Sequence, residues 1–348
     1  MTTMNDIAER TGLSRATVSY VLNGRHQKRL GQETRDRVLA AAAEMGYRSN
    51  ELARAVATGK SRTLGILTNQ EIGEPQARTI GGALAEATRH GYSTKLMHVP
   101  FNADEEEATH VLQLCTSWRL DGALVIGLSD PHVELLRDEM AHGDRPVAFV
   151  GAMPPENSIG AYSDDVAAWR LAVQHLVDLG HRRIAHLGAR PDSKLSQSRS
   201  ASCLQMLREF GLPVDEHSNT FTSWADSQVI AEGLQRLLDA PHRPTALLCA
   251  GDSLAMVTLY EARKRGLSVP HDLSVIGFGD LSTAPYTDPP LTSIAEPIEE
   301  TARHAVRQLL ARIEGESSTV NESNIPFKLT TGFRVVVRSS TAPPVQTM

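Results

Sequence analysis

The sequence predicts a small all-α helix-turn-helix head followed by an α/β bilobal core made of two doubly wound parallel sheets. Three observations support this fold class. Two short amphipathic segments with a glycine between them open the chain, and apolar strand-like runs alternate with amphipathic helical runs from Leu64 onward. The length of 348 residues also exceeds one ordinary domain, and 41% hydrophobic residues support sizeable cores.

The head is predicted from the stretch Asn5 to Asn23. Its apolar residues fit two short helices that meet across the turn Thr11-Gly12-Leu13, where Gly12 suits a left-handed conformation. Two such helices also occur in domains that bind nothing. A third helix over Glu33 to Met45 completes a three-helix core and favours a DNA-binding head.

The second helix leaves a polar face outside the head core, and such a face can enter a major groove. Arg15, Ala16 and Tyr20 are the predicted base-reading residues, because Arg15 can fork onto a guanine edge and Ala16 offers a methyl contact. The alternative for Arg15 is a plain phosphate contact. Predicted DNA-backbone contacts are Ser14, which also suits an N-cap, Thr17, Ser19, Asn23, Arg25 and Lys28.

Charge is distributed unevenly along the chain. Residues 1 to 60 hold ten Lys or Arg against six Asp or Glu, which is net +4, whereas the whole chain is net -6 and the remainder therefore -10. A basic head on an acidic body is typical of a protein whose head alone faces phosphate.

Strands and helices alternate through the rest of the chain, which indicates parallel sheets covered on both faces. The first unit is predicted to contain LGILTN, STKLMHV, GALVIG and PVAFVG as strands, with helices over Gln76 to His90, over Asp104 to Trp118 and from His132. The second unit is predicted to contain RRIAHLG, a strand near Thr220, TALLCAG and LSVIGFG, with helices over Asp165 to Leu179, Gln197 to Phe210, Ser227 to Leu238 and Asp252 to Arg265.

Several spaced motifs carry a family resemblance. The runs DIAERTGLSRATVSYVLNG, ETRDRVLAAAAEMGY, NELARAVATGKSRTLGIL, HLVDLGHRRIAHLG, RPTALLCAGDSLA, VPHDLSVIGFGD and PPLTSI occur in this order. Together they resemble the lactose and galactose repressor (LacI/GalR) family of bacterial transcription regulators over nearly the whole chain. The resemblance implies a repressor with a periplasmic-binding-protein-like core, which pairs as a homodimer on a near-palindromic operator under the control of a small-molecule effector.

The resemblance also implies the domain order. The expected parts are the DNA-binding head at 1–48, a hinge helix and linker at 49–60, a core N-terminal lobe at 61–161 with 292–322, a C-terminal lobe at 162–291 with 323–340, and a tail at 341–348. In particular, LTSIAEP and a helix over Glu299 to Ile313 are expected to return to the first lobe, and FKLTTGFRVVV to finish in the second.

Asn50 to Ala57 resembles the family's hinge helix, which enters the minor groove beside its dimer mate. A helix of this length is too short to be stable alone in water. The expected minor-groove residues are Ala53, Arg54 and Val56, and Val56 stands where the family usually has a leucine wedge. The alternative is that Val56 only packs against the mate helix.

Ligands of open parallel sheets bind beyond the carboxyl ends of the strands, and two such lobes form a cleft there. The resemblance implies that Arg199 holds oxygen atoms of the effector and that Trp224 stacks against the effector. The alternative for Arg199 is a surface ion pair. The alternative for Asp252 is that it N-caps its helix and does not contact the ligand. The same alternative holds for Asp164. The expected effector residues are Asn69, Gln70, Tyr162, Asp164, Arg199, Trp224, Asp252 and Asp280.

The sequence departs from many sugar-responsive relatives at this site. Gly251 and Gly279 stand where those relatives have Asn and Asp, so two hydrogen-bonding side chains are absent. A carbohydrate or related metabolite is still expected as effector, in a pocket of different shape.

Other function classes fit less well. Gly251-Asp252-Ser253-Leu254 spells a GDSL-type esterase signature, but no later Asp-x-x-His partner follows, so no enzyme activity is expected. A transport-type sugar-binding protein would lack the basic head and carry a signal sequence. Cys115, Cys203 and Cys249 are too far apart for a disulfide framework. We expect a cytoplasmic, nucleoid-associated protein with no metal, cofactor or membrane partner.

Overall fold

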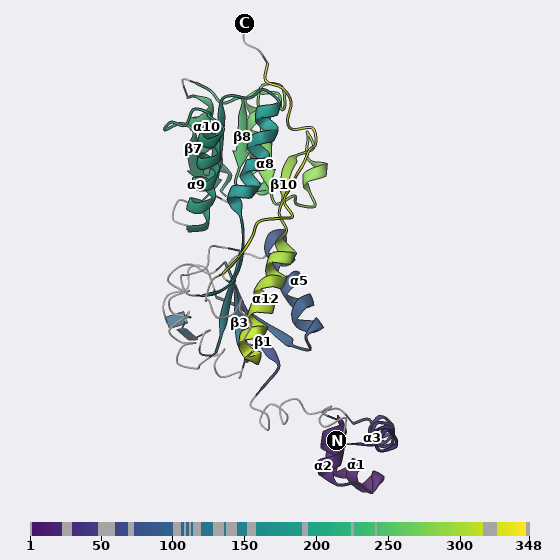
Figure 1. The fold of residues 1–348 in the computed structure, drawn as a ribbon. Helices are drawn as coiled ribbons and strands as arrows, with labels where there is room; N and C mark the ends of the chain where they lie inside the picture. The colour runs from purple at the N-terminus through teal and green to yellow at the C-terminus, as the bar shows by residue number, and fades with distance from the viewer. Residues whose placement is uncertain are drawn as a thin grey trace. The chain divides into compact units, whose positions relative to one another are not determined.

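The computed structural model of the chain describes residues 2–22, 30–47, 60–68, 73–99, 106–107, 109–110, 113, 120–127, 136, 145–151, 158–189, 194–223, 226–240, 242–315 and 326–345. The chain forms two compact units, Met1–Arg62 and Thr63–Met348 (Figure 1). None of the helices in these ranges is long and apolar enough to cross a membrane.

The first unit is a three-helix head. The turn between the first two helices passes through Gly12, whose φ of 65° lies in the left-handed region that glycine tolerates. Ser14 begins the second helix, because its Oγ accepts a hydrogen bond from the Thr17 N–H at 3.1 Å. Ile7, Val18 and Val38 are fully buried and form the centre of the head core. The helices are α1 Met4–Thr11, α2 Arg15–Leu22 and α3 Gln32–Glu44.

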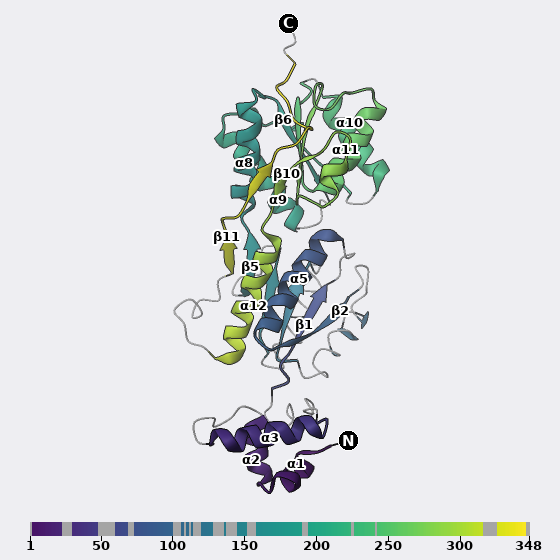
Figure 2. The same cartoon turned by 90° about the vertical axis from the view of Figure 1, so that its right-hand side faces the viewer.

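The first lobe of the second unit is built on a parallel sheet in the order β11-β5-β4-β3-β1-β2. Apolar residues from helices α5 and α12 cover one face of this sheet (Figure 2). The predicted helices over Asp104 to Trp118 and from His132 lie mostly outside the described residues. The elements are β1 Thr63–Thr68, α5 Glu74–Arg89, β2 Ser93–His98, β3 Gly122–Ile126, β4 Val147–Val150, β5 Ile159–Ser163, α12 Ile298–Glu314 and β11 Phe327–Leu329.

The second lobe is built on a sheet in the order β12-β10-β9-β8-β6-β7, in which only the pair β10–β12 is antiparallel. Side chains of α8 and α9 cover one face and those of α10 and α11 the other. The elements are α8 Asp165–Asp178, β6 Ile184–Ala189, α9 Lys194–Glu209, β7 Asn219–Thr222, α10 Ser227–Leu238, β8 Ala246–Cys249, α11 Asp252–Lys264, β9 Ser274–Phe278, the 3-10 helix η2 Ala284–Tyr286, β10 Thr292–Ala295 and β12 Arg334–Val336.

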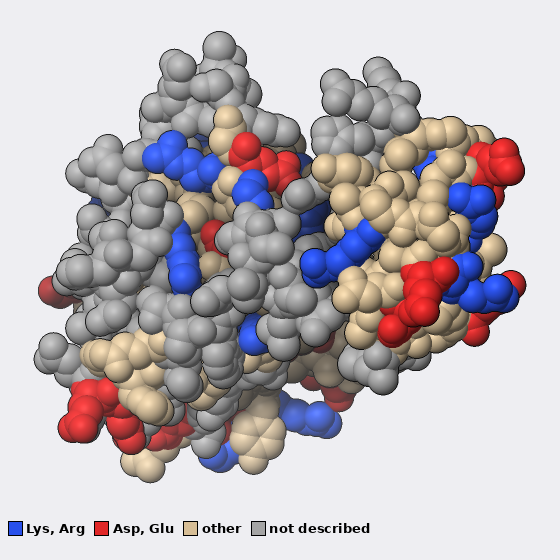
Figure 3. Space-filling view, turned by 90° about the horizontal axis from the view of Figure 1, so that it is seen from below, with Lys and Arg blue, Asp and Glu red and all other residues tan. Residues whose placement is uncertain are grey.

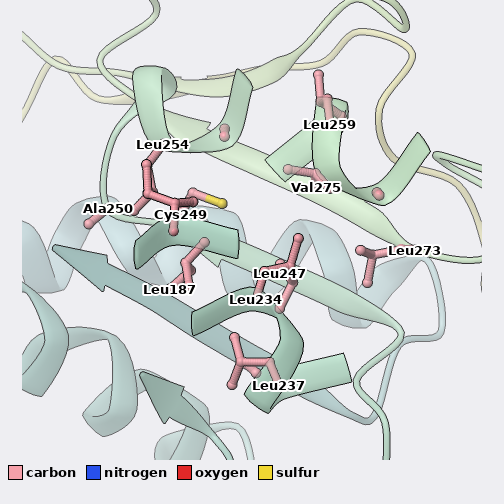
Figure 4. Packing of buried hydrophobic residues seen from close by; sticks show 14 of the residues in the cluster. Leu187, Leu234, Leu237, Leu247, Cys249, Ala250, Leu254, Leu259, Leu273 and Val275 are labelled. Carbon is pink, nitrogen blue, oxygen red and sulfur yellow. The ribbon is translucent and has the colours of Figure 1, made fainter. Parts of the chain in front are cut away.

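Continuous apolar runs in the strands explain why this sheet is buried on both faces. Leu187, Leu247 and Cys249 point from the strands toward Leu234 of α10 and Leu254 of α11 (Figure 4). Cys249 is fully buried, and burial raises the pKa of its thiol to about 12, so it acts as a small hydrophobic residue. Cys203 is likewise buried, whereas Cys115 lies outside the described residues.

The structure corrects two details of the predicted lobe composition. LTSIAEP does not return to the first lobe, because its strand β10 pairs with β9 and β12 in the second sheet. The chain returns only at Glu296-Pro297, directly before α12. Conversely, the residues Phe327–Leu329 pair with β5 in the first sheet, and only the later part of FKLTTGFRVVV joins the second. A strand of four residues carries too little pattern to assign it to one sheet from sequence alone.

The chain therefore crosses between the lobes three times. The crossings follow β5, β10 and β11, and they are short.

Helices α5 and α12 approach closely at Gly82, because a Cβ there would lie 2.6 Å from the Glu299 carbonyl oxygen. Gly82→Ala should therefore destabilise the first lobe by about 1–3 kcal/mol, since backbone must shift to accept the methyl group. The neighbouring Gly81 is exposed with nothing within 4 Å of its Cβ position. Gly81→Ala should be neutral or stabilise by up to about 1 kcal/mol through helix propensity. Urea unfolding followed by circular dichroism tests both, and equal effects would contradict the close approach.

Candidate DNA-binding face and interlobe site

Helix α2 presents the predicted base-reading residues on the outside of the head. Val18 is fully buried, whereas Arg15 and Ala16 are exposed and Tyr20 is 39% exposed. Within the described residues Arg15 makes no ion pair, whereas Arg10 of the same head pairs with Glu44 at 3.5 Å. The Arg15 guanidinium is therefore available to an external partner.

The predicted backbone contacts are only partly described. Ser14 and Thr17 lie at the start of α2, and their hydroxyl oxygens are 2.9 Å apart, so both remain close to the helix N-terminus. Ser19 is half-buried on the same helix. Outside the described residues lie Asn23, Arg25, Lys28, Ala53, Arg54 and Val56.

Basic side chains do not form one continuous patch among the residues that Figure 3 describes. On the face shown, Lys and Arg side chains lie apart from one another and beside Asp and Glu (Figure 3).

Two predicted effector residues are held by basic partners at the junction of the lobes. The Asp164 carboxylate N-caps α8 by accepting from the backbone of Val166 and Ala167, and it also lies 2.9 Å from the Lys328 ammonium. Asp280, at a φ of 48°, lies 2.7 Å from the Arg338 guanidinium.

Asp252 does not cap its helix through its side chain, because Gly251 is the N-cap of α11. Its buried carboxylate instead accepts a hydrogen bond from the Leu281 N–H at 2.6 Å and one from the Ser293 hydroxyl at 2.5 Å. The carboxylate has room only because residue 277 is a glycine. A Cβ at Gly277 would lie 2.0 Å from Asp252 Oδ1. Burial raises the pKa of Asp252, although both hydrogen bonds oppose that rise.

Arg199 is mostly covered, with 12% of its side chain exposed, so its ion pair is not a surface one. Its Nε and Nη2 lie 3.3 and 3.2 Å from Asp165 Oδ1, and Nη1 donates to the Ala250 carbonyl at 3.2 Å. Its planar face lies 3.9 Å above the centre of the Phe278 ring. Burial lowers the pKa of Arg199, but the carboxylates of Asp165 and Glu296 outweigh it and raise the pKa overall.

Glu296 adds a second carboxylate to this cluster at 3.8 Å from Arg199 Nη2. Burial raises the pKa of Glu296, and the Arg199 charge opposes that rise. One guanidinium thus faces two carboxyl groups where the chain crosses between lobes. Sequence reasoning missed Asp165, which was predicted only as the start of a helix, and Glu296, which directly follows β10.

A second set of contacts joins the lobes through α5. Both Glu74 carboxylate oxygens lie 3.0 Å from the Ser282 N–H, and the Ser282 hydroxyl donates to Oε2 at 2.7 Å. Arg78 donates to the Gly279 carbonyl at 3.1 Å and forks onto both Glu299 carboxylate oxygens at 2.7 and 3.1 Å. The only sequence signal for Glu74 was its position before Pro75, which is typical of a helix start.

The remaining predicted effector residues are described less completely. Tyr162 is half-buried on β5, which leads into the first crossing. Asn69, Gln70 and Trp224 lie outside the described residues. The GDSL run does not form an activated nucleophile in the described part of the chain, because Ser253 is exposed on α11 with no histidine or carboxylate bonded to it.

His186 lies behind this site in β6 and is fully buried. Its Nδ1 lies 2.8 Å from Asn219 Oδ1, so Nδ1 carries the proton, and its Nε2 has no partner in the described structure. The Trp169 ring meets the imidazole edge-on at 5.4 Å. Burial lowers the pKa of His186 to about 4, which keeps the imidazole neutral.

Because the pKa of His186 is lower in the folded chain than in the unfolded one, acidification should destabilise the fold. The loss begins below the unfolded pKa near 6.5 and continues to about 4, and it should reach up to about 3 kcal/mol. His186→Gln should flatten the pH dependence of the unfolding free energy in this window. The exposed His217→Gln is the matched control; an equal flattening in both variants would contradict the assignment.

Known proteins resemble this chain over most of its length. Residues 3–50 match the family described as "Bacterial regulatory proteins, lacI family", and residues 173–341 match a "Periplasmic binding protein-like domain". The HTH-type transcriptional repressor CytR of Escherichia coli is 32% identical over 318 residues, covering 90% of each chain. Catabolite control protein A of Priestia megaterium is 29% identical, covering 94% of this chain and 97% of its own.

Solved structures show the same fold. The crystal structure of the Lac repressor dimer bound to operator and the anti-inducer ONPF matches with a TM-score of 0.79 and 25% identity, covering 98% of this chain and 99% of that chain. A complex of the transcriptional regulator CelR with cellobiose matches with a TM-score of 0.70 and 25% identity, covering 98% of this chain and 100% of that chain.

Proposed function

The chain belongs to the lacI family of bacterial regulatory proteins, and we propose that this DNA-binding transcriptional regulator is a repressor that binds a near-palindromic operator as a homodimer. Its similar relatives are transcriptional regulators, not enzymes, so neither the esterase alternative nor a transport role is retained. A small-molecule effector between the two lobes of the core controls operator affinity.

The outward face of α2 carries this proposal. A buried Val18 fixes the orientation of the helix, and Arg15, Ala16 and Tyr20 are thereby presented to a major groove. Two heads of a dimer would read two half-sites about 10 base pairs apart or a multiple of that spacing. Residues 49–60 would form the hinge between head and core, with Ala53, Arg54 and Val56 in the minor groove.

Exposed apolar side chains of the core support the dimer. Leu84 of α5, Tyr260 of α11 and Tyr286 of η2 are 39%, 64% and 88% exposed. Their elements are contiguous, because Ser282 bonds to Glu74 of α5 and Thr283 to Met256 of α11. We propose that the partner subunit covers these three side chains of α5, η2 and α11, which are large, apolar and exposed.

The effector proposal rests on the polar residues at the lobe junction. Arg199 already binds Asp165 and Ala250, which leaves few of its N–H groups for a ligand. The surrounding carboxylates favour a ligand that donates hydrogen bonds, as the hydroxyl groups of a carbohydrate do. Asp252, Asp280 and Tyr162 are the other described candidates for contact, and Asn69, Gln70 and Trp224 complete the proposed set.

Selection of bound sequences from a random DNA pool, at a stated salt concentration, tests the function. The intact protein should select a two-fold symmetric site. Arg15→Ala should lose about 1–3 kcal/mol of specific binding and relax the preference at one base pair in each half-site. Arg37→Ala, at an exposed position of α3, is the matched control and should select the wild-type site. Sequence-blind binding by the intact protein would reject the proposed operator.

Tyr286→Asp tests the dimer surface. A charge at this position should oppose burial against a partner, so sedimentation should show monomers at concentrations where the intact protein is dimeric, and operator affinity should fall. Leu171→Asp on α8, where the leucine is 40% exposed, is the control and should remain dimeric. A dimeric Tyr286→Asp protein with intact operator affinity would move the interface elsewhere.

A further inference from the structure

The loop formed by residues 279–282 directly follows β9 and is held in a restricted conformation. Asp280 has a φ of 48°, a value that residues other than glycine rarely adopt, and Gly279 has a φ of 121°. The Gly279 N–H donates to the Ile294 carbonyl at 2.8 Å, which fixes the start of the loop to β10. A conformation of this kind persists only where surrounding contacts determine it.

One side of the 279–282 loop is bound to proposed effector residues. Asp252 accepts from the Leu281 N–H at 2.6 Å, and Asp280 pairs with Arg338 at 2.7 Å. Ser293 accepts from the Asp280 N–H at 3.0 Å and donates to Asp252, so the two aspartates share one hydrogen-bond network. A ligand that moves either carboxylate must therefore move the loop backbone.

The other side of the same loop is bound to α5 of the opposite lobe. The Glu74 carboxylate accepts hydrogen bonds from the backbone N–H and the hydroxyl of Ser282. Arg78 donates a hydrogen bond to the Gly279 carbonyl. Both ends of the loop are thus fixed to one helix by hydrogen bonds in which one partner is charged, which are stronger than neutral ones. Glu74 also lies in the first turn of α5, where the helix dipole favours a carboxylate.

A displacement of α5 would also displace α12, because the two helices are in direct contact. Arg78 forks onto Glu299 of α12, and the backbones of the two helices meet at Gly82. The same helix carries Leu84 of the proposed dimer surface. A shift of the 279–282 loop therefore changes the position of a helix that the partner subunit would contact.

We infer that the 279–282 loop, through Glu74 and Arg78, couples the effector site to helix α5 and so to the operator-binding arrangement of the dimer. This inference rests on the proposed function and adds the residues that would carry its regulation. Coupling is reciprocal, so operator binding must alter the same loop even when no effector is present. The prediction holds whether the effector weakens or strengthens operator binding.

Hydrogen–deuterium exchange of the full-length protein tests the coupling, with the selected operator duplex as the probe at saturating concentration. In the intact protein, operator should change the exchange rate of the peptide spanning 279–282 by about fivefold or more, as expected for allosteric coupling. In Glu74→Ala and in Arg78→Ala, operator should still bind, but the operator-dependent change should fall to near none. Glu106→Gln, an exposed carboxylate of the same lobe, should behave as the intact protein does.

Two results would overturn the inference. One is an unchanged loop in the intact protein on operator binding, and the other is a full operator-dependent change in both Glu74→Ala and Arg78→Ala. If either alanine variant fails to fold, Glu74→Gln, which keeps the shape and removes the charge, should show a reduced change. Failure of the proposed function would be seen separately, as the absence of any selected operator.

Discussion

The buried carboxylate of Asp252 holds together the part of the core where the two lobes meet. It is 1% exposed, and its two oxygens join α11 to Leu281 of the 279–282 loop and to Ser293 of β10. A buried carboxylate is stable only when hydrogen bonds replace its water, and here one backbone N–H and one hydroxyl do so. The absence of a side chain at Gly277 is the complementary requirement, since any Cβ would occupy the carboxylate's position.

This arrangement explains a departure seen in the sequence. Gly279 replaces a hydrogen-bonding residue of many relatives, but its φ of 121° and its carbonyl contact with Arg78 give it another role. A side chain at this backbone conformation would be strained. Gly279 thus permits a tight turn whose carbonyl accepts a hydrogen bond from Arg78 of the first lobe.

The sequence was sufficient for the helix-turn-helix head and for the alternation of strands and helices. These features depend on local signals, such as Gly12 in the turn, Ser14 before α2 and the apolar run of β6, and each appears in the structure as predicted. Assignment of β10 to the first lobe was wrong, because strand pairing over a four-residue segment depends on neighbours that are remote in sequence. The contacts of Glu74 with Ser282 were equally inaccessible, since 208 positions separate the two residues.

The carboxyl groups of Asp165 and Glu296 lie around Arg199. They show why the sequence could predict where a site residue lies but not what that residue binds. An arginine at this place could be expected to bind ligand oxygens, yet most of its donors are used by Asp165 and Ala250. Removing one partner of such a buried cluster leaves an uncompensated charge, which costs more than the pair contributes when intact. Arg199 therefore orients Asp165 and Glu296 as much as it would hold a ligand. The family resemblance supplied the residue, but only its partners in three dimensions define what it can bind.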